Sequence, residues 1–257
     1  MKTSKKTALM NVVWGAVAVC VIFVVWLIAY ACVKNDYVLP GVGQTFEQFF
    51  ALFGQSSFYI ALGNTLLRTV ISFVISFALA ALFAAVSAVC RPFYVVFSCL
   101  VSVVRTLPTM AVTLMLLIWS TPLVAPAIVT ALVLFPMLYS QLVAAIDGVD
   151  FKLLEMAKVY GLSRRTKLTK IILPSILPET LAQVGAGLSL GLKIMISAEV
   201  LSYTFNSIGG MMQQAQLYAE MPRFAALTLM CIALGLLFEL LSFGIRCALR
   251  RLWGGRQ

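Results

Sequence analysis

The chain has no histidine and only nine acidic residues among its 257 residues. It therefore lacks the side chain that most often serves as a catalytic base or a metal ligand. No carboxylates cluster in the apolar segments, and the six cysteines show no C-x-x-C spacing. The cysteines lie in or beside apolar runs, where we interpret them as small buried hydrophobic residues. These absences argue against a membrane-embedded enzyme and against a metal site.

Two nucleotide-related patterns are also missing. The sequence contains no G-x-x-x-x-G-K-[ST], so this chain has no loop of that kind to cradle the phosphates of ATP. Its basic residues are not interleaved with exposed aromatic residues, as nucleic-acid sites require. We therefore expect neither ATP nor nucleic acid to bind directly to this chain.

What the sequence does have is apolar residues. Hydrophobic residues make up 62% of the chain and charged residues 11%, and the mean hydropathy is +1.02. Several apolar runs reach the roughly 20 residues that cross a bilayer as a helix, and they lack the alternation of barrel strands. The fold class is therefore an all-α polytopic membrane protein. We expect six transmembrane helices, at about 9–33, 64–89, 94–118, 123–146, 175–203 and 224–246.

Most basic residues fall on one side of these spans. With the N-terminus in the cytoplasm, fourteen of the nineteen lie inside, and both termini are cytoplasmic. These fourteen are Lys2, Lys5, Lys6, Arg91, Lys152, Lys158, Arg164, Arg165, Lys167, Lys170, Arg246, Arg250, Arg251 and Arg256. We interpret the net charge of +10 as a topology signal and a contact with anionic lipid. Residues 9–33 form too long a run for a signal peptide, which favours a retained first span.

Small residues and prolines suggest how the helices pack. The second span carries Ser72, Ser76, Ala80, Ala84 and Ala88 at four-residue spacing, which makes a smooth face for close helix contact. A Gly187-x-x-x-Gly191 pattern predicts ordinary close packing in the fifth span, or a sliding contact. Pro108, Pro126 and Pro136 can each kink a span and leave room for a cavity.

Two polar stretches lie outside these spans. Phenylalanines at near-helical spacing over 46–53 predict a short amphipathic helix on the outer interface. The stretch 204–222 is too polar to span, and we expect it outside, folded back over the bundle. No domain boundary and no internal repeat is evident, which counts against an inverted-repeat transporter.

Residues 147–178 form a charged segment within the apolar chain. Asp150 can cap a helix that begins at Phe151, and Glu155 can pair with Lys158 on its exposed face. Gly161 suits the left-handed position that ends a helix, and Ser163 can cap a second helix. The segment is thus predicted to be two short cytoplasmic helices joined at a glycine, a shape that fits a groove on another protein. The alternative is a solvated loop that merely satisfies the positive-inside rule.

The spacing within this segment resembles a family motif. Glu155-Met156-Ala157, Gly161 and Ile171-Ile172-Leu173-Pro174 match the EAA loop of bacterial ABC importer permeases, E-A-A-x3-G-x9-I-x-L-P, except that Met156 replaces an alanine. Further matches resemble the branch that serves nitrate, sulfonate, taurine, bicarbonate and thiamine-precursor importers, over roughly residues 39–250. They are Leu39-Pro40, Asn64 to Arg68, Arg105 to Pro108, Phe135-Pro136, Ala198-Glu199 and Gly209-Gly210.

The resemblance implies a division of the chain and a set of partners. Residues 1–60 would form an N-terminal transmembrane helix and an outer interfacial segment, and 61–250 the type-1 transmembrane domain with its coupling loop at 147–174. A second permease copy, two cytoplasmic ATPase subunits that bind ATP and Mg²⁺, and an external solute-binding protein would complete an importer in the bacterial cytoplasmic membrane. The ATPase-coupling residues would be Glu155, Met156, Ala157, Gly161, Arg164, Ile171, Leu173 and Pro174. The solute would be a small anion such as a sulfonate, nitrate or taurine, or a thiamine-type pyrimidine.

Four ionisable residues lie within the predicted spans, namely Arg105, Lys193, Glu199 and Glu239. Each is costly in lipid, so each needs a partner or a wet cavity. One hypothesis is that Arg105, Pro108, Lys193 and Glu199 belong to the translocation path, where Arg105 or Lys193 attracts an anion and Glu199 has a structural or gating role. The other is that the four charges pair across helices. A secondary transporter or channel that needs no ATPase remains the alternative function.

Overall fold

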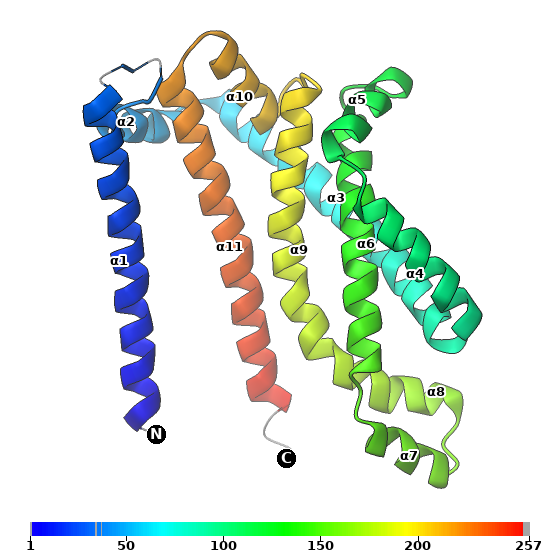
Figure 1. Ribbon diagram of the computed structural model, residues 1–257. Coiled ribbons are helices and arrows are strands. Elements are labelled where there is room, and N and C mark those ends of the chain that lie inside the picture. The colour runs from blue at the N-terminus through cyan, green and yellow to red at the C-terminus, as the bar shows by residue number, and fades with distance from the viewer. Residues whose placement is uncertain (1, 34, 37, 254–257) are drawn as a thin grey trace.

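The computed structural model describes residues 2–33, 35–36 and 38–253, and every regular element in these ranges is helical (Figure 1). The elements are α1 (Lys2–Val33), α2 (Val42–Leu52), α3 (Ser56–Val89), α4 (Arg91–Arg105), α5 (Thr109–Trp119), α6 (Ala125–Asp147), α7 (Phe151–Val159), α8 (Arg164–Lys167), the π-helical turn η1 (Leu168–Ile172), α9 (Leu173–Leu201), α10 (Ile208–Leu217) and α11 (Met221–Trp253). In lipid no water is present to bind the backbone N–H and C=O groups, so apart from closed barrels only helices can pair them. An all-helical fold therefore suits elements of such high apolar content.

The long helices run between two ends of a bundle. The start of α1 and the end of α11 lie at the same end as α7 and α8, and α2 and α10 lie at the other (Figure 1). Within the described ranges, α3, α6, Gln183–Leu201 of α9 and Met221–Ile245 of α11 are long and apolar enough to span a membrane, and the pair α4–α5 makes a fifth if it counts as one span. In α1 the apolar segment is the shorter Cys20–Val33, so a sixth span stays a prediction.

The expected span 94–118 is wrong as a single helix. Helix α4 ends at Arg105, α5 begins at Thr109, and the two meet at 91°. Pro108 has no N–H to continue the helix, and its ring disfavours helical backbone at Leu107. Pro126 lies in the first turn of α6, where proline is tolerated, so of the two prolines expected to kink this span only Pro136 lies inside the helix.

The centre of the bundle is the contact of α3 with α6 and α9. The hydroxyls of Ser72 and Ser76 donate to the carbonyl oxygens of Ala127 and Ala131 in α6, both at 3.0 Å. Ala80 and Ala84 are buried beside them, which confirms the predicted small-residue face as far as Ala84. Ala88, the last residue of that series, is exposed.

The glycine pattern of α9 lies in the same core. A Cβ atom at Gly187 would lie 2.8 Å from the ring of Phe73 in α3, and one at Gly191 would lie 3.0 Å from Leu134 in α6. Both glycines therefore let neighbouring side chains approach the backbone of α9, as close packing of membrane helices requires.

The segments outside the spans fold over one end. Helix α2 contains the predicted amphipathic stretch, and α10 packs against α3, α9 and α11. Helix α1 meets α2 and its preceding turn through Phe23, whose ring centroid lies 6.1 Å from that of Phe46, and through Trp26, whose Nε1 donates to the Pro40 carbonyl oxygen at 3.1 Å. The cysteines were expected to be buried, but all are exposed except the half-buried Cys231. Helix faces turned toward lipid also accept apolar side chains, so a cysteine need not be buried inside the bundle.

Candidate coupling surface and translocation path

Helix α7 and helix α8 form a projection beyond one end of the bundle, residues 147–174 (Figure 1). The Asp150 carboxylate accepts from the backbone N–H of Lys152 at 2.9 Å and caps α7. Gly161 has φ +61°, a left-handed conformation that a side chain would strain, and the N–H of Leu162 donates to the carbonyl oxygen of Ala157. Ser163 then accepts from the N–H of Thr166 at 3.2 Å and caps the next helix. The predicted pair of helices joined at a glycine is therefore present.

The projection exposes apolar side chains. Val159 is 84% exposed, Tyr160 76%, Phe151 68% and Met156 47%. Val159 follows Met156 by three positions, which places both on one side of α7, and Tyr160 is the residue that caps the end of the helix. Exposed apolar groups that gather on a polar segment are typical of a surface that binds another protein. Phe151, Val159 and Tyr160 were not among the predicted coupling residues, although their helical spacing in a charged segment was the available signal.

The predicted coupling residues follow one another along this projection. Glu155 and Met156 are exposed on α7, Ala157 is 2% exposed, and Arg164 begins α8. The expected Glu155–Lys158 ion pair is not among those formed by the described residues. Both side chains are exposed, where such a pair contributes little against the entropy of ordering it.

The remaining coupling residues lie where the projection joins the bundle. Ile171 is half-buried in the π-helical turn, and Leu173 and Pro174 begin α9. The N–H of Leu173 donates to the carbonyl oxygen of Leu168, and Pro174 has no N–H to donate. Helix α8, the π-helical turn and α9 are consecutive, so one helical path leads from the projection into the bundle.

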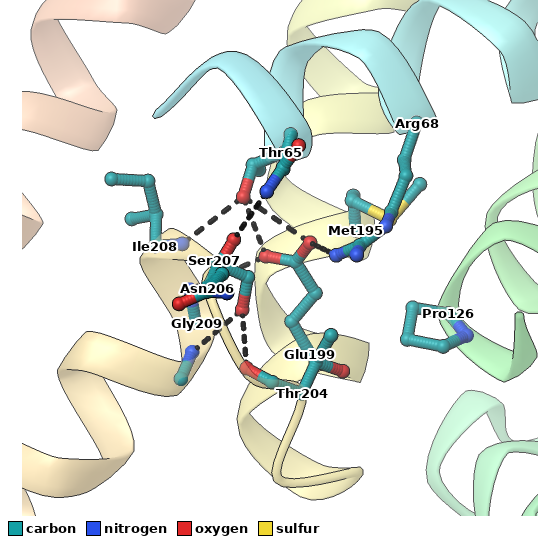
Figure 2. A network of polar contacts seen from close by, with 12 residues as sticks. Thr65, Arg68, Pro126, Met195, Glu199, Thr204, Asn206, Ser207, Ile208 and Gly209 are labelled. Atoms are coloured by element: carbon teal, nitrogen blue, oxygen red, sulfur yellow. Dashed lines mark hydrogen bonds and ion pairs between the residues drawn. The ribbon is translucent and has the colours of Figure 1, made fainter. Parts of the chain in front are cut away.

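A buried ion pair lies toward the opposite end of α9. Figure 2 shows the Glu199 carboxylate between Thr65 and Arg68 of α3, with the start of α10 beside it. Arg68 Nη1 lies 3.1 Å from Glu199 Oε1, Thr65 Oγ1 donates to Oε2 at 2.9 Å, and the N–H of Gly209 donates to Oε2 at 3.3 Å. Glu199 is fully buried, and the Arg68 side chain is 19% exposed. The carboxylate is thus paired and hydrogen-bonded, as a buried charge must be.

This network ties three helices and two loops together. Thr65 Oγ1 also accepts from the N–H of Ile208 at 3.0 Å, and Asn64 donates to the carbonyl oxygen of Asn206 at 3.0 Å. Thr204 donates to the carbonyl oxygen of Pro122 at 2.8 Å. At Gly209 a Cβ atom would overlap that of Glu199 and lie 2.7 Å from the carbonyl oxygen of Ile196. The stretch 204–222, expected to fold back over the bundle, does so by direct backbone contact with α9.

Two cavities are lined by Lys193 and Arg105, two of the other predicted path residues. A cavity of about 460 Å³ between α5, α6, α9 and α10 is lined in part by Lys193, Thr113 and Ser197. A second, of about 210 Å³, is lined in part by Arg105, Pro136 and Leu190, and Thr109 contributes to both. Arg105 Nη2 donates to the carbonyl oxygen of Pro136 at 3.1 Å. Pro108 forms the corner between α4 and α5. Arg105 and Lys193 therefore line adjoining spaces, while Glu199 lines neither.

The four charges do not pair with one another. Among the described residues, ion pairs join Arg68 to Glu199 and Arg223 to Glu220, and neither includes Arg105, Lys193 or Glu239. Glu199 thus forms a cross-helix pair as the second hypothesis expected, but with Arg68 of α3 rather than with one of the other three charges. In the same described ranges, no three acidic or cysteine side chains come together as metal ligands would.

This chain resembles known proteins in both sequence and fold. A Bacillus subtilis (strain 168) protein, SsuC, that carries the name of an aliphatic sulfonates transport permease is 29% identical over 117 residues. That match covers 45% of this chain and 42% of SsuC, so this chain spans about two fifths of the length of the curated relative it matches.

Solved structures give the fold. A bacterial ABC transporter involved in the import of the acidic polysaccharide alginate superposes with a TM-score of 0.66 at 18% identity, covering 91% of this chain and 96% of that one. The MetNI methionine ABC transporter, in an inward-facing conformation, gives a TM-score of 0.60 at 16% identity, covering 73% and 94%. Residues 79–246 match the family described as the inner membrane component of binding-protein-dependent transport systems, and the chain belongs to that family.

Proposed function

We propose that this chain is the membrane-spanning subunit of an ATP-driven importer, which forms the path for a small solute and is moved by a separate ATPase. The observation that carries the proposal is the projection with its exposed apolar residues Met156, Val159 and Tyr160. A solvated loop that only set topology would have no need of such residues. Glu155, Met156, Ala157, Gly161, Arg164, Ile171, Leu173 and Pro174 form or support that surface in the proposal.

The partners follow from the same proposal. Two ATPase subunits hold ATP and Mg²⁺ and receive the projections of two copies of this chain, while an external binding protein delivers the solute. The family description names dependence on a binding protein. The chain lies in the bacterial cytoplasmic membrane with the projection and both termini in the cytoplasm, because fourteen basic residues gather on that side. The matched residues 79–246 fall within the proposed transmembrane domain, 61–250.

The proposed solute is a small anion. Arg105 and Lys193 place positive charge beside two adjoining cavities, and the relative SsuC is named for aliphatic sulfonates. A thiamine-type pyrimidine is the second candidate, and it would gain nothing from those two cations. Glu199 holds helices together at one end of the path in this proposal, because its carboxylate is already occupied by Arg68 and Thr65.

Changing Tyr160 to aspartate tests the coupling surface. We expect Tyr160→Asp to reduce the amount of ATPase that copurifies with the chain at least tenfold, because a carboxylate in an apolar contact must be desolvated without a partner. The measurement is a pull-down of the tagged chain from native membranes, followed by quantification of the ATPase. Tyr218→Asp is the matched control, since Tyr218 at the other end of the bundle is also 76% exposed. Equal losses in both variants would refute the coupling role of α7.

Changing Arg105 to glutamine tests the anion path. We expect Arg105→Gln to lower the rate of ATP-driven solute uptake about tenfold, because removing a cation roughly 10 Å from the anion at an effective dielectric near 20 forfeits about 1.7 kcal/mol of attraction. Uptake is measured in liposomes that contain the whole transporter. Arg91→Gln, at a helix start outside both path cavities, is the control. Unchanged uptake by Arg105→Gln would remove Arg105 from the path, and uptake by the chain with no ATPase would favour the secondary-transporter alternative.

A further inference from the structure

A small pocket at one end of the bundle carries two charges of opposite sign. It has a volume of about 150 Å³, lies where α3 ends, α4 begins and α6 ends, and is lined in part by Arg91, Tyr94 and Asp147. We propose that this pocket binds the head group of a phospholipid with a primary amine, phosphatidylethanolamine, with the phosphate at Arg91 and the ammonium at Asp147. The ligand is a lipid and not the transported solute, and the pocket shares no lining residue with either path cavity.

The position of the pocket matches the depth of lipid head groups. The spans Ser56–Val89 and Ala125–Asp147 both end beside it, and the bent pair α4–α5 begins there. This is the end of the bundle that carries α7 and α8 (Figure 1). Polar head groups occupy the boundary where spans leave the hydrocarbon. A molecule with a polar head and an apolar tail therefore meets the pocket without leaving the membrane.

The protein compensates neither charge of the pocket. Among the residues that the structure describes, Arg91 and Asp147 form no ion pair with each other or with a third residue. The Arg91 guanidinium lies over the ring of Tyr94, 5.0 Å from the ring centroid. This contact orients the guanidinium through its face and leaves its N–H donors available. Both charged side chains are exposed, so a ligand can reach them.

Each charge also lies at the helix end that disfavours it. Arg91 is the first residue of α4, and Asp147 is the last residue of α6. A helix dipole favours anions at its N-terminus and cations at its C-terminus. In the described chain, α4 has no side-chain cap and the last turn of α6 has no basic residue. A phosphate at the start of α4 and an ammonium at the end of α6 would supply the charges that both helix ends favour.

The two charges together select among phospholipids. Phosphatidylglycerol has a phosphate for Arg91 but no cation for Asp147, whose carboxylate repels a head group of net negative charge. Phosphatidylcholine has a cation, but three methyl groups replace the N–H donors that a carboxylate accepts. Of these three head groups, phosphoethanolamine alone offers an anion and a hydrogen-bonding cation at once.

An apolar surface for an acyl chain adjoins the pocket. Val89 is part of the lining, and Val86 and Leu82 precede it by three and seven positions, on the same face of α3. These side chains are 82%, 40% and 59% exposed. The stripe leads from the pocket toward the middle of the span, in the direction that an acyl chain takes from its head group. Its continuity with the pocket favours a lipid over a soluble zwitterion.

The experiment is a titration of the full-length chain in detergent with three phospholipids of identical acyl chains, followed by native mass spectrometry. We expect phosphatidylethanolamine to bind about fivefold more tightly than phosphatidylcholine or phosphatidylglycerol, because its ammonium alone donates to Asp147. Asp147→Asn should reduce this preference to about twofold or less, and Asp147→Glu should keep it. Arg91→Gln should weaken the binding of all three lipids. The matched control is Glu47→Gln, which removes an exposed carboxylate from α2 at the other end and should keep the preference.

A soluble head group distinguishes the lipid from a free zwitterion. Glycerophosphoethanolamine has the same phosphate and ammonium but no acyl chains, so we expect it to bind about tenfold more weakly or worse. Equal affinity for this compound and for the lipid would assign the pocket to a soluble molecule and overturn the proposal. A preference that survives Asp147→Asn, or equal affinity of the unaltered chain for phosphatidylethanolamine and phosphatidylcholine, would also overturn it. None of these measurements needs an ATPase or a transported solute, so their failure would leave the proposed function standing.

Discussion

Replacing Glu199 with alanine is expected to lower the free energy of unfolding by about 3–5 kcal/mol. The substitution leaves the Arg68 guanidinium, only 19% exposed, without its carboxylate. It also removes the acceptor of Thr65 and of the Gly209 N–H, which lie in the buried contact of α3, α9 and α10. A buried cation and a buried backbone donor without partners each carry a desolvation cost. The change is measured by titration with sodium dodecyl sulfate in mixed micelles.

The partner variants show whether the charge pair itself is responsible. Glu199→Gln keeps the shape and can still accept from Thr65, so we expect a smaller loss than for alanine. The double variant Glu199→Gln with Arg68→Met removes both charges, so neither charge is left unpaired. Its loss of unfolding free energy should therefore be smaller than the sum of the losses in the two single variants. Additive losses, or a loss below about 1 kcal/mol for Glu199→Ala, would mean that the pair does not hold these helices together.

A valine at Gly185 is expected to lower the free energy of unfolding by about 3 kcal/mol or more. A Cβ atom there would overlap the Cβ and Oγ atoms of Ser242 and lie 2.8 Å from the carbonyl oxygen of Phe238. The carbonyl belongs to the backbone of α11, so it cannot move away as the end of a side chain can. Helices α9 and α11 would have to separate along part of their contact. The same detergent titration gives the magnitude.

The control for this substitution is a valine at Gly63. Gly63 also lies within a long helix, α3, but a Cβ atom there meets nothing within 4 Å. We expect Gly63→Val to change stability by no more than about 0.5 kcal/mol, because valine has a somewhat better helix propensity than glycine. If the two valines had equal effects, the helix propensity of valine rather than the α9–α11 contact would explain them.

The elements that sequence predicted well depend on local rules. Apolar length located four of the six expected spans, and the caps at Asp150 and Ser163 with the left-handed Gly161 follow from neighbouring residues alone. The right-angled break at Pro108 was foreseen only as a kink. A proline specifies that the helix is interrupted, but the angle depends on what packs around the interruption.

The parts that sequence missed depend on contacts between distant residues. Arg68 and Glu199 lie in separate spans, and nothing in either local sequence specifies that they meet. The different surroundings of Lys193 and Glu199 could not be predicted either, because the two residues lie only six positions apart on one helix. The structure shows that Lys193 lines a cavity whereas Glu199 is fully buried. The exposed face of α7 could have been foreseen, since Met156, Val159 and Tyr160 recur at helical spacing.

The unbroken course of the chain from Arg164 to Leu201 has a mechanical consequence. At 1.5 Å per residue this bent helical path has a contour length of roughly 55 Å, and Glu199 lies near one end. A displacement of α8 would reach the carboxylate only through the π-helical turn at 168–172 and past Pro178, the two places where the regular helical hydrogen bonding is altered. The π-helical turn would then determine how far a displacement of α8 moves the start of α9.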